Sequence, residues 1–173
     1  KTIQRYHPGV SLMWIGSFAV KVFNFLYRVF TGSNPPDNEI SVLFQLHFIQ
    51  KIFIVLVLAA LVTLIFHVLR RVINTKYAII AVAFLVLEPF YVALTRVVHL
   101  EGLQSTFILA SFMCLYMYLN SDKNKKWFFV SSFLAALAVL TKTSAIFLLP
   151  FSGLLLFGVK FMDTKKFMRS LSW

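Results

Sequence analysis

Three ionisable residues lie close together at the junction of two long apolar runs. The stretch LTRVVHLEGLQ, residues 94–104, holds Arg96, His99 and Glu101. An arginine fork binds phosphate or carboxylate through paired hydrogen bonds, and a nearby histidine or glutamate could orient it or move a proton. Ionisable groups at membrane depth cost a few kcal/mol each, so each needs a partner, water or a function. The stretch is therefore either a solvated loop or the wall of an anion-binding site.

Two further charges sit where the sequence is otherwise apolar. Glu88 is followed by Pro89, and proline bends a helix, so this pair predicts the kinked wall of a cavity. Glu88 could instead pair with Arg96 or with a neighbouring helix. Lys142 lies in the TKTS turn between two short apolar segments, below headgroup level, where it needs an anion. A phosphate, Glu88 or Glu101 would serve, and the simpler alternative is a lysine that extends to the interface.

The stretch YHPGVSLMW, residues 6–14, predicts a fixed turn that leads into a helix. His7 precedes Pro8 and Gly9, and the free N–H groups at the start of the following helix can accept an anion. The sequence has no Walker loop, HExxH motif or dinucleotide fingerprint. The single cysteine, Cys114, supports neither a disulfide nor a thiolate metal site. We therefore predict no metal site and no certain cofactor, and leave metal dependence open.

The elements that position these residues are transmembrane helices. The 173 residues are 60% hydrophobic and 13% charged, which is typical of a chain that lies in lipid. The net charge of +11 does not indicate a nucleic-acid partner, because the basic residues cluster at the ends of apolar segments. The composition predicts an all-α, multi-pass membrane protein whose partner is the lipid bilayer.

Three windows approach the length that a bilayer requires. They are residues 52–69, 77–94 and 103–119, and two shorter apolar segments follow at 127–140 and 145–159. Ten of the 17 basic residues lie in three links, which the helix count places on one side, taken as cytoplasmic. The 95–102 link and the TKTS turn then lie together on the opposite side.

The amino-terminal part is expected to differ from the rest. Residues 9–31 are long enough to span, but Lys21 and Arg28 interrupt them on one helical face, which favours one or two helices lying in the interface. A crossing helix is the alternative. Asp37 or Asn38 could cap the next helix. We predict an extracytoplasmic loop with juxtamembrane helices at residues 1–45 and a membrane region of about five segments at residues 46–173.

The ordered set YHPGVSLMWIG, ALTRVVHLEGLQSTFILASF and LAALAVLTKTSAIFLLP resembles the GT-C superfamily of polyprenyl-phosphate-sugar glycosyltransferases. The similarity is closest to the bacterial protein O-mannosyltransferase and lipid A aminoarabinose transferase branch. His7 matches the family's His-Pro-Gly motif, Arg96 the arginine of its Ser-Arg motif, and Lys142 the lysine of its Leu-Thr-Lys motif. Glu88 and Glu101 stand where relatives carry aspartate, so they keep the charge on a longer arm.

The resemblance implies a cytoplasmic-membrane enzyme that moves a sugar from a polyprenyl phosphate to an extracytoplasmic protein, lipid or glycan. It implies that His7, Arg96 and Lys142 bind the donor phosphate, and that Glu88, His99 and Glu101 orient them or line the cavity. The acidic catalytic base is expected upstream of Lys1, in a larger membrane domain of which this chain is a piece, so the chain alone is expected to be inactive. The rival hypothesis is a transporter or lipid flippase, which inverted repeats and paired broken helices would favour.

Overall fold

The computed structural model of the chain describes residues 9–36, 39–96, 99–120 and 124–161, apart from the side chains of residues 96 and 159–161. These residues form helices and contain no strands, so the predicted all-α, multi-pass class is confirmed. The elements are α1 (Val10–Thr31), α2 (Ile40–Val72), α3 (Thr75–Leu87), α4 (Pro89–Arg96), α5 (Leu100–Asn120), α6 (Lys125–Thr141), the 3-10 helix η1 (Thr143–Phe147) and α7 (Leu148–Phe161).

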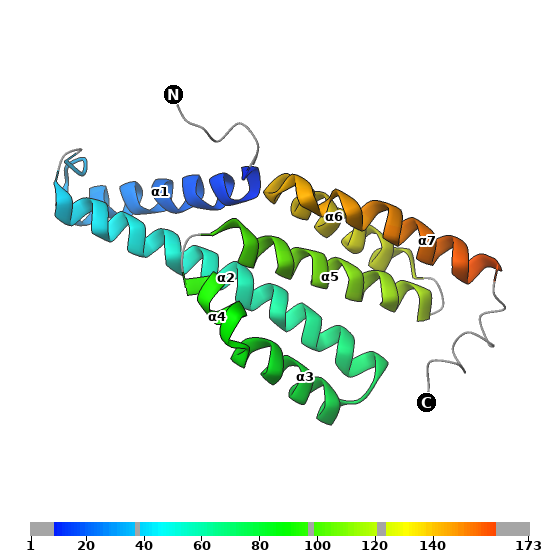
Figure 1. Cartoon of the computed structure of the whole chain (residues 1–173). Helices are drawn as coiled ribbons and strands as arrows, with labels where there is room; N and C mark the ends of the chain where they lie inside the picture. Colours follow the sequence, from blue (N-terminus) through cyan, green and yellow to red (C-terminus); the bar gives the residue numbers. More distant parts are fainter. Residues whose placement is uncertain (1–8, 37–38, 97–98, 121–123, 162–173) are drawn as a thin grey trace.

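Helix α5 lies at the centre of the bundle (Figure 1). It packs against α6 on one side and α2 on the other, while α3 covers α2 and α1 runs beside the first part of α2. The buried core lies mostly where α5 meets α2 and α6, and it includes Ile54, Leu58, Leu61, Ile65, Leu103, Phe107, Ala110, Cys114, Leu134 and Ala138. Large apolar side chains also cover the outside: Phe84, Phe147 and Leu154 are each more than 70% exposed. An apolar exterior of this kind suits contact with lipid.

Helices α5 and α6 are joined by hydroxyl groups within this core. The Ser111 hydroxyl donates to the backbone oxygen of Ser131, and the Ser131 hydroxyl donates to the backbone oxygen of Ser111, each at 2.8 Å. Small residues of this type let two helices approach closely, and in lipid their hydrogen bonds help to hold helices together. The sequence alone does not predict this pairing. The two hydrogen bonds hold the helix that carries Glu101 against the helix that leads to Lys142.

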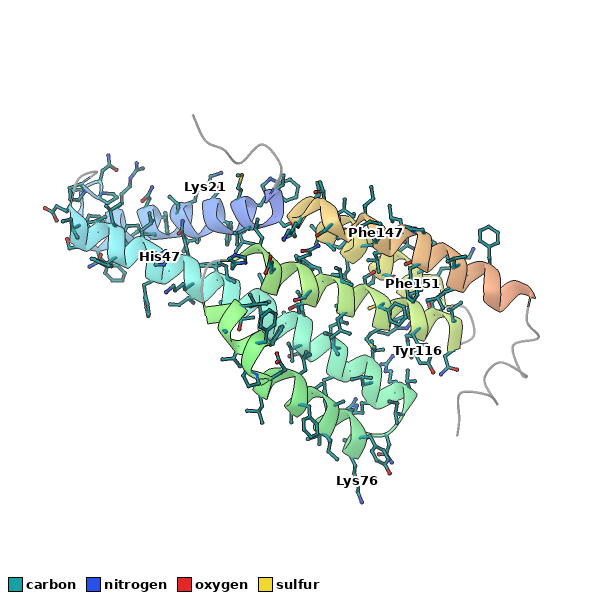
Figure 2. The ribbon with its side chains drawn as sticks, viewed as in Figure 1. Lys21, His47, Lys76, Tyr116, Phe147 and Phe151 are labelled. Atoms are coloured by element: carbon teal, nitrogen blue, oxygen red, sulfur yellow. The ribbon has the colours of Figure 1, made fainter. Side chains whose placement is uncertain are left out.

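The two ends of the bundle differ in charge. The α2–α3 turn, the end of α5 and the start of α6 lie at one end (Figure 1), where Lys76 points away from the helices (Figure 2). The described basic residues of the first two predicted cytoplasmic links are exposed at this end, namely Arg70, Arg71, Lys76, Lys125 and Lys126. The ends of α4 and α6 and the starts of α1 and α5 lie at the opposite end, as the helix count predicts.

Helix α2 is longer than a bilayer requires. Its 33 residues extend about 50 Å at 1.5 Å per residue, against a hydrocarbon core of about 30 Å. Its first part continues with α1 beyond the end of the bundle (Figure 1). Glu39 is its N-cap residue, whereas Asp37 and Asn38, the predicted caps, lie outside the described residues. The boundary predicted after residue 45 falls inside α2 and stays a prediction about the membrane surface.

Three described helices are long and apolar enough to cross a membrane: α1, α2 and α5. Helices α3 and α4 taken together are also long and apolar enough to cross a membrane, but the pair is bent by 61° at the break between them. Helix α1 is a single helix that meets the length and composition of a span, and its interfacial position and the crossing alternative both stay predictions. Helices α6 and α7 are shorter, with 17 and 14 residues, as the sequence predicts for the last two segments.

Candidate functional site

Segments that are far apart in the sequence meet at the end of the bundle opposite the basic links. The backbone N–H of Gly9 donates to the carbonyl of Thr141 at 3.2 Å, which joins the start of α1 to the end of α6. One turn further along, the hydroxyl of Ser11 donates to the carbonyl of Leu137 at 3.0 Å. Gly9 adopts a left-handed backbone (φ 53°), which favours glycine at this turn. Gly9, the last residue of the His-Pro-Gly motif, is therefore attached directly to Thr141 of the Leu-Thr-Lys motif.

A salt bridge joins the Leu-Thr-Lys segment to the start of α5. The Nζ atom of Lys142 lies 2.9 Å from Oε1 of Glu101, although the two residues are 41 positions apart. Lys142 lies at the break between α6 and η1 with an extended backbone (φ −155°, ψ 132°). Its side chain is 23% exposed and that of Glu101 is 42% exposed. Glu101 is thus one of the anions that the sequence predicts for Lys142, and the pair is open enough for a further ligand to reach it.

Polar side chains around this salt bridge fix the local backbone. The buried Gln104 donates from Nε2 to the hydroxyl of Ser144 at 2.8 Å, a second link between α5 and the turn that follows Lys142. The backbone N–H of Glu101 donates to Nδ1 of His99 at 3.3 Å. His99 therefore caps the first turn of α5, and Glu101 lies in that turn, where the helix dipole favours a negative charge.

Glu88 marks the break between α3 and α4. Its carboxylate oxygens accept the backbone N–H of Phe90, at 3.1 Å, and that of Tyr91. These bonds cap the N-terminus of α4, where Pro89 cannot continue the hydrogen bonding of α3. The predicted kink is confirmed by the 61° bend. The carboxylate of Glu88 therefore stabilises the bend between α3 and α4. The side chain of Arg96, one of its predicted partners, is not described.

Two of the predicted phosphate ligands have no described side chain. His7 lies outside the described residues, two positions before Gly9. Arg96 is the last residue of α4, and only its backbone is described. The roles of both residues stay predictions. Among the residues that the structure describes, no three His, Cys, Asp or Glu side chains gather where they could hold a metal ion.

Gly102, which the sequence does not single out, lies close to α4. A Cβ atom on Gly102 would lie 3.1 Å from Cγ2 of Thr95 and 3.2 Å from the carbonyl oxygen of Leu94, closer than ordinary van der Waals contact. Below this contact the hydroxyl groups of Tyr91 and Thr106 are hydrogen-bonded at 2.8 Å. The available signal was a glycine inside the first turn of an apolar helix, where small residues mark close helix packing. Gly102 therefore sets the distance between α4 and the helix that carries Glu101.

Comparison with known proteins decides the family. The family model of the dolichyl-phosphate-mannose-protein mannosyltransferases matches residues 41–171. The chain belongs to this family. It is therefore a membrane glycosyltransferase of the GT-C type and an integral membrane protein. No curated protein and no solved structure gives a significant match.

Proposed function

We propose that the protein transfers a sugar from a polyprenyl-phosphate donor to an acceptor on the extracytoplasmic side of the cell membrane. The observation that carries this proposal is the Lys142–Glu101 salt bridge, at the point where three separated segments of the chain meet. The family description, which names a dolichyl-phosphate sugar as donor, supports a lipid-linked substrate. The location of the site at the end opposite the basic links supports an extracytoplasmic reaction.

The chemistry requires cations near a departing phosphate. An acceptor oxygen attacks the anomeric carbon, the bond from that carbon to the phosphate oxygen breaks, and the polyprenyl phosphate leaves with the bonding electrons. Positive groups fixed in a region of low dielectric stabilise the charge that develops on this oxygen. Lys142 is the described candidate for this role, and Arg96 and His7 are proposed beside it because their segments adjoin the same junction. In this proposal no cation acts as the base.

The acidic residues are proposed to position these cations. Glu101 holds Nζ of Lys142 at 2.9 Å, and His99 caps the helix turn that carries Glu101. Glu88 fixes the α3–α4 bend and thereby the direction of the helix that ends at Arg96. Because both carboxylates are engaged, we assign the deprotonation of the acceptor to a group other than Glu88 and Glu101.

The test measures transfer of labelled sugar from a polyprenyl phosphate by the natural full-length protein in proteoliposomes. Lys142→Ala is expected to lower the turnover about 10²-fold or more, the usual effect of removing a group that stabilises transition-state charge. The matched control is Lys21→Ala, since Lys21 is an exposed lysine on α1 that points away from the bundle (Figure 2). Thermal unfolding of both variants shows whether the fold is retained.

Wild-type turnover by a correctly folded Lys142→Ala variant would contradict the assignment of Lys142. Failure of the unmodified protein to transfer sugar from any member of a polyprenyl-phosphate-sugar panel would contradict the proposed function itself. A further variant, Glu101→Gln, keeps the shape of the side chain and removes its charge. It is expected to weaken donor binding less than Lys142→Ala, because the cation remains.

A further inference from the structure

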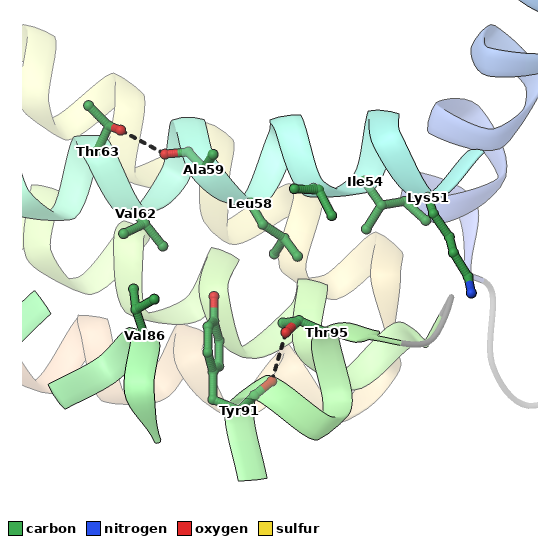
Figure 3. Close-up of a pocket in the computed structure, with 10 residues that line it drawn as sticks. Lys51, Ile54, Leu58, Ala59, Val62, Thr63, Val86, Tyr91 and Thr95 are labelled. Atoms are coloured by element: carbon green, nitrogen blue, oxygen red, sulfur yellow. Dashed lines mark hydrogen bonds between the residues drawn. The ribbon is translucent and has the colours of Figure 1, made fainter. Parts of the chain in front are cut away.

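An open groove of about 600 Å³ lies between α2 and the bent α3–α4 pair (Figure 3). One face of α2 forms its first wall, from Lys51 through Ala59 and Val62, and Val86 and Tyr91 are among the residues on the facing wall. The spacing of the α2 residues, about one or two turns apart, keeps them on one helical face. The volume falls within the range of pockets that hold small organic ligands.

The bend at Glu88 creates this groove. Helix α3 packs against α2, whereas α4 packs against α5. The hydrogen bond between Tyr91 and Thr106 and the close approach of Thr95 to Gly102 hold α4 on α5. The two helices therefore diverge from the bend, and the space between α2 and α4 is left unfilled.

The lining has one charged group and is otherwise mainly apolar. The hydroxyl of Thr63 donates to the carbonyl of Ala59, and that of Thr95 donates to the carbonyl of Tyr91, so neither hydroxyl requires a ligand. Lys51 lies at one end of the groove (Figure 3), and within the described parts of the chain no hydrogen bond or ion pair to its ammonium group is found. An apolar groove with a cation at its end is complementary to an amphiphile with an anionic head.

The charged end of the groove lies at the same end of the bundle as the candidate site. Lys51 directly precedes the apolar window 52–69, so it lies where the membrane-spanning part of α2 begins. Thr95 lines the same groove, and its methyl group occupies the space that a Cβ on Gly102, the residue after Glu101, would need. A head group at Lys51 would therefore lie at the same end of the bundle as the Lys142–Glu101 salt bridge.

We propose that this groove binds the polyprenyl chain of the donor, with Lys51 contacting the phosphate at its mouth. This inference rests on the proposed function, and it adds a binding surface and a cation that the family motifs do not include. The distance from Lys51 to Thr63 along α2 is about 18 Å at 1.5 Å per residue. The groove thus takes the isoprene units nearest the phosphate, and the rest of a long chain extends into lipid.

The test uses a farnesyl phosphate that carries a photoactivatable group on its terminal isoprene, added to the full-length protein in phosphatidylcholine nanodiscs. We expect the label to attach to residues of the two groove walls. Ala59→Trp fills the groove and is expected to lower labelling at least about tenfold, equivalent to about 1.4 kcal/mol of binding free energy. Its matched control is Ala60→Trp, because Ala60 is the adjacent exposed alanine and lines a different, apolar groove against α1, α5 and α6.

A second comparison tests the head group. Lys51→Gln is expected to weaken binding of farnesyl phosphate at least about fivefold, and to leave binding of uncharged farnesol unchanged. Lys21→Gln, an exposed lysine on α1, serves as the control. Equal labelling of the Ala59→Trp and Ala60→Trp variants would overturn the groove assignment, as would displacement of the probe by excess phosphatidylglycerol at the groove.

Sugar transfer measured on the same samples separates this inference from the proposed function. Transfer that proceeds normally in a folded Ala59→Trp protein, with the label attached elsewhere, would overturn the groove and leave the function standing. Labelling in the groove that depends on Ala59 and Lys51, without sugar transfer by the unmodified protein, would support the groove and contradict the function.

Discussion

Replacing Gly102 with alanine tests the contact that positions the start of α5. The added Cβ would lie 3.1 Å from Cγ2 of Thr95 and 3.2 Å from the carbonyl oxygen of Leu94. Ordinary contacts between such atoms begin at about 3.5 Å, so α4 must move by a few tenths of an ångström. Overpacking of this kind typically costs about 1–3 kcal/mol. A shift of α4 also weakens the Tyr91–Thr106 hydrogen bond, which contributes about 0.5–1.5 kcal/mol.

Helix propensity acts in the opposite direction. Alanine is favoured over glycine inside a helix by about 1 kcal/mol, so the net effect of Gly102→Ala is a destabilisation of about 0–2 kcal/mol. Gly153→Ala isolates the propensity term, because Gly153 lies in α7 and a Cβ there meets nothing within 4 Å. We therefore expect Gly102→Ala to be about 1–3 kcal/mol less stable than Gly153→Ala.

The assay is reversible unfolding of the protein in detergent micelles, followed by circular dichroism. Gly102→Val adds a larger, β-branched side chain at the same position and should lower the stability further. If Gly102→Ala stabilises the protein as much as Gly153→Ala does, the close packing of α4 on α5 is refuted. The placement of α4 on α5, away from α2, would then rest on the Tyr91–Thr106 hydrogen bond alone.

Three further predictions concern topology, the arginine and the isolated chain. In a cysteine-free background, cysteines placed at Thr75 and Asn124 should resist an impermeant thiol reagent added outside the cell. A cysteine at Asn34 should react with the same reagent. Reaction of all three cysteines from one side would contradict the predicted topology. Arg96→Lys should lose most transfer activity and still accumulate normally, because lysine lacks the planar fork of arginine; near-native turnover would make Arg96 a simple anchor. Residues 1–173 alone should bind polyprenyl phosphate weakly, lose this binding on Lys142→Ala, and transfer no sugar. Sugar transfer by these residues that Glu101→Gln abolishes would make Glu101 catalytic.

The spans and the bend could be predicted from the sequence because each depends on local properties. Apolar length identifies α2 and α5, and Pro89 identifies the break after α3, since proline removes a hydrogen-bond donor whatever surrounds it. The cost of an unpaired charge near lipid made a glutamate one possible partner of Lys142, beside a phosphate or an extension of the side chain to the interface. Which glutamate it pairs with depends on the packing of α5 against α6, so the sequence left Glu88 and Glu101 as alternatives.

The parts that could not be predicted depend on contacts between helices. The role of Gly102 depends on the packing of α4 against α5. The sequence shows a glycine in an apolar helix, but it does not show whether another helix packs against that glycine. Ser105 shows the same limit. Its hydroxyl donates to the carbonyl of Gly102 within α5, and the sequence does not distinguish this bond from one to another helix. Gln104 and Ser111 do bond to other segments.

The reciprocal serine pair has a consequence for how the chain enters the membrane. Helix α6 has 17 residues, begins with two lysines and carries hydroxyl groups, so it is a poor candidate for insertion by itself. Ser111 and Ser131 can form their two hydrogen bonds as soon as α5 and α6 have both been synthesised, because only a few residues of the chain separate the two helices. The two should leave the translocon as one hairpin. Glycosylation mapping of truncated chains would show this as integration of α6 that requires α5 and is reduced by Ser111→Leu.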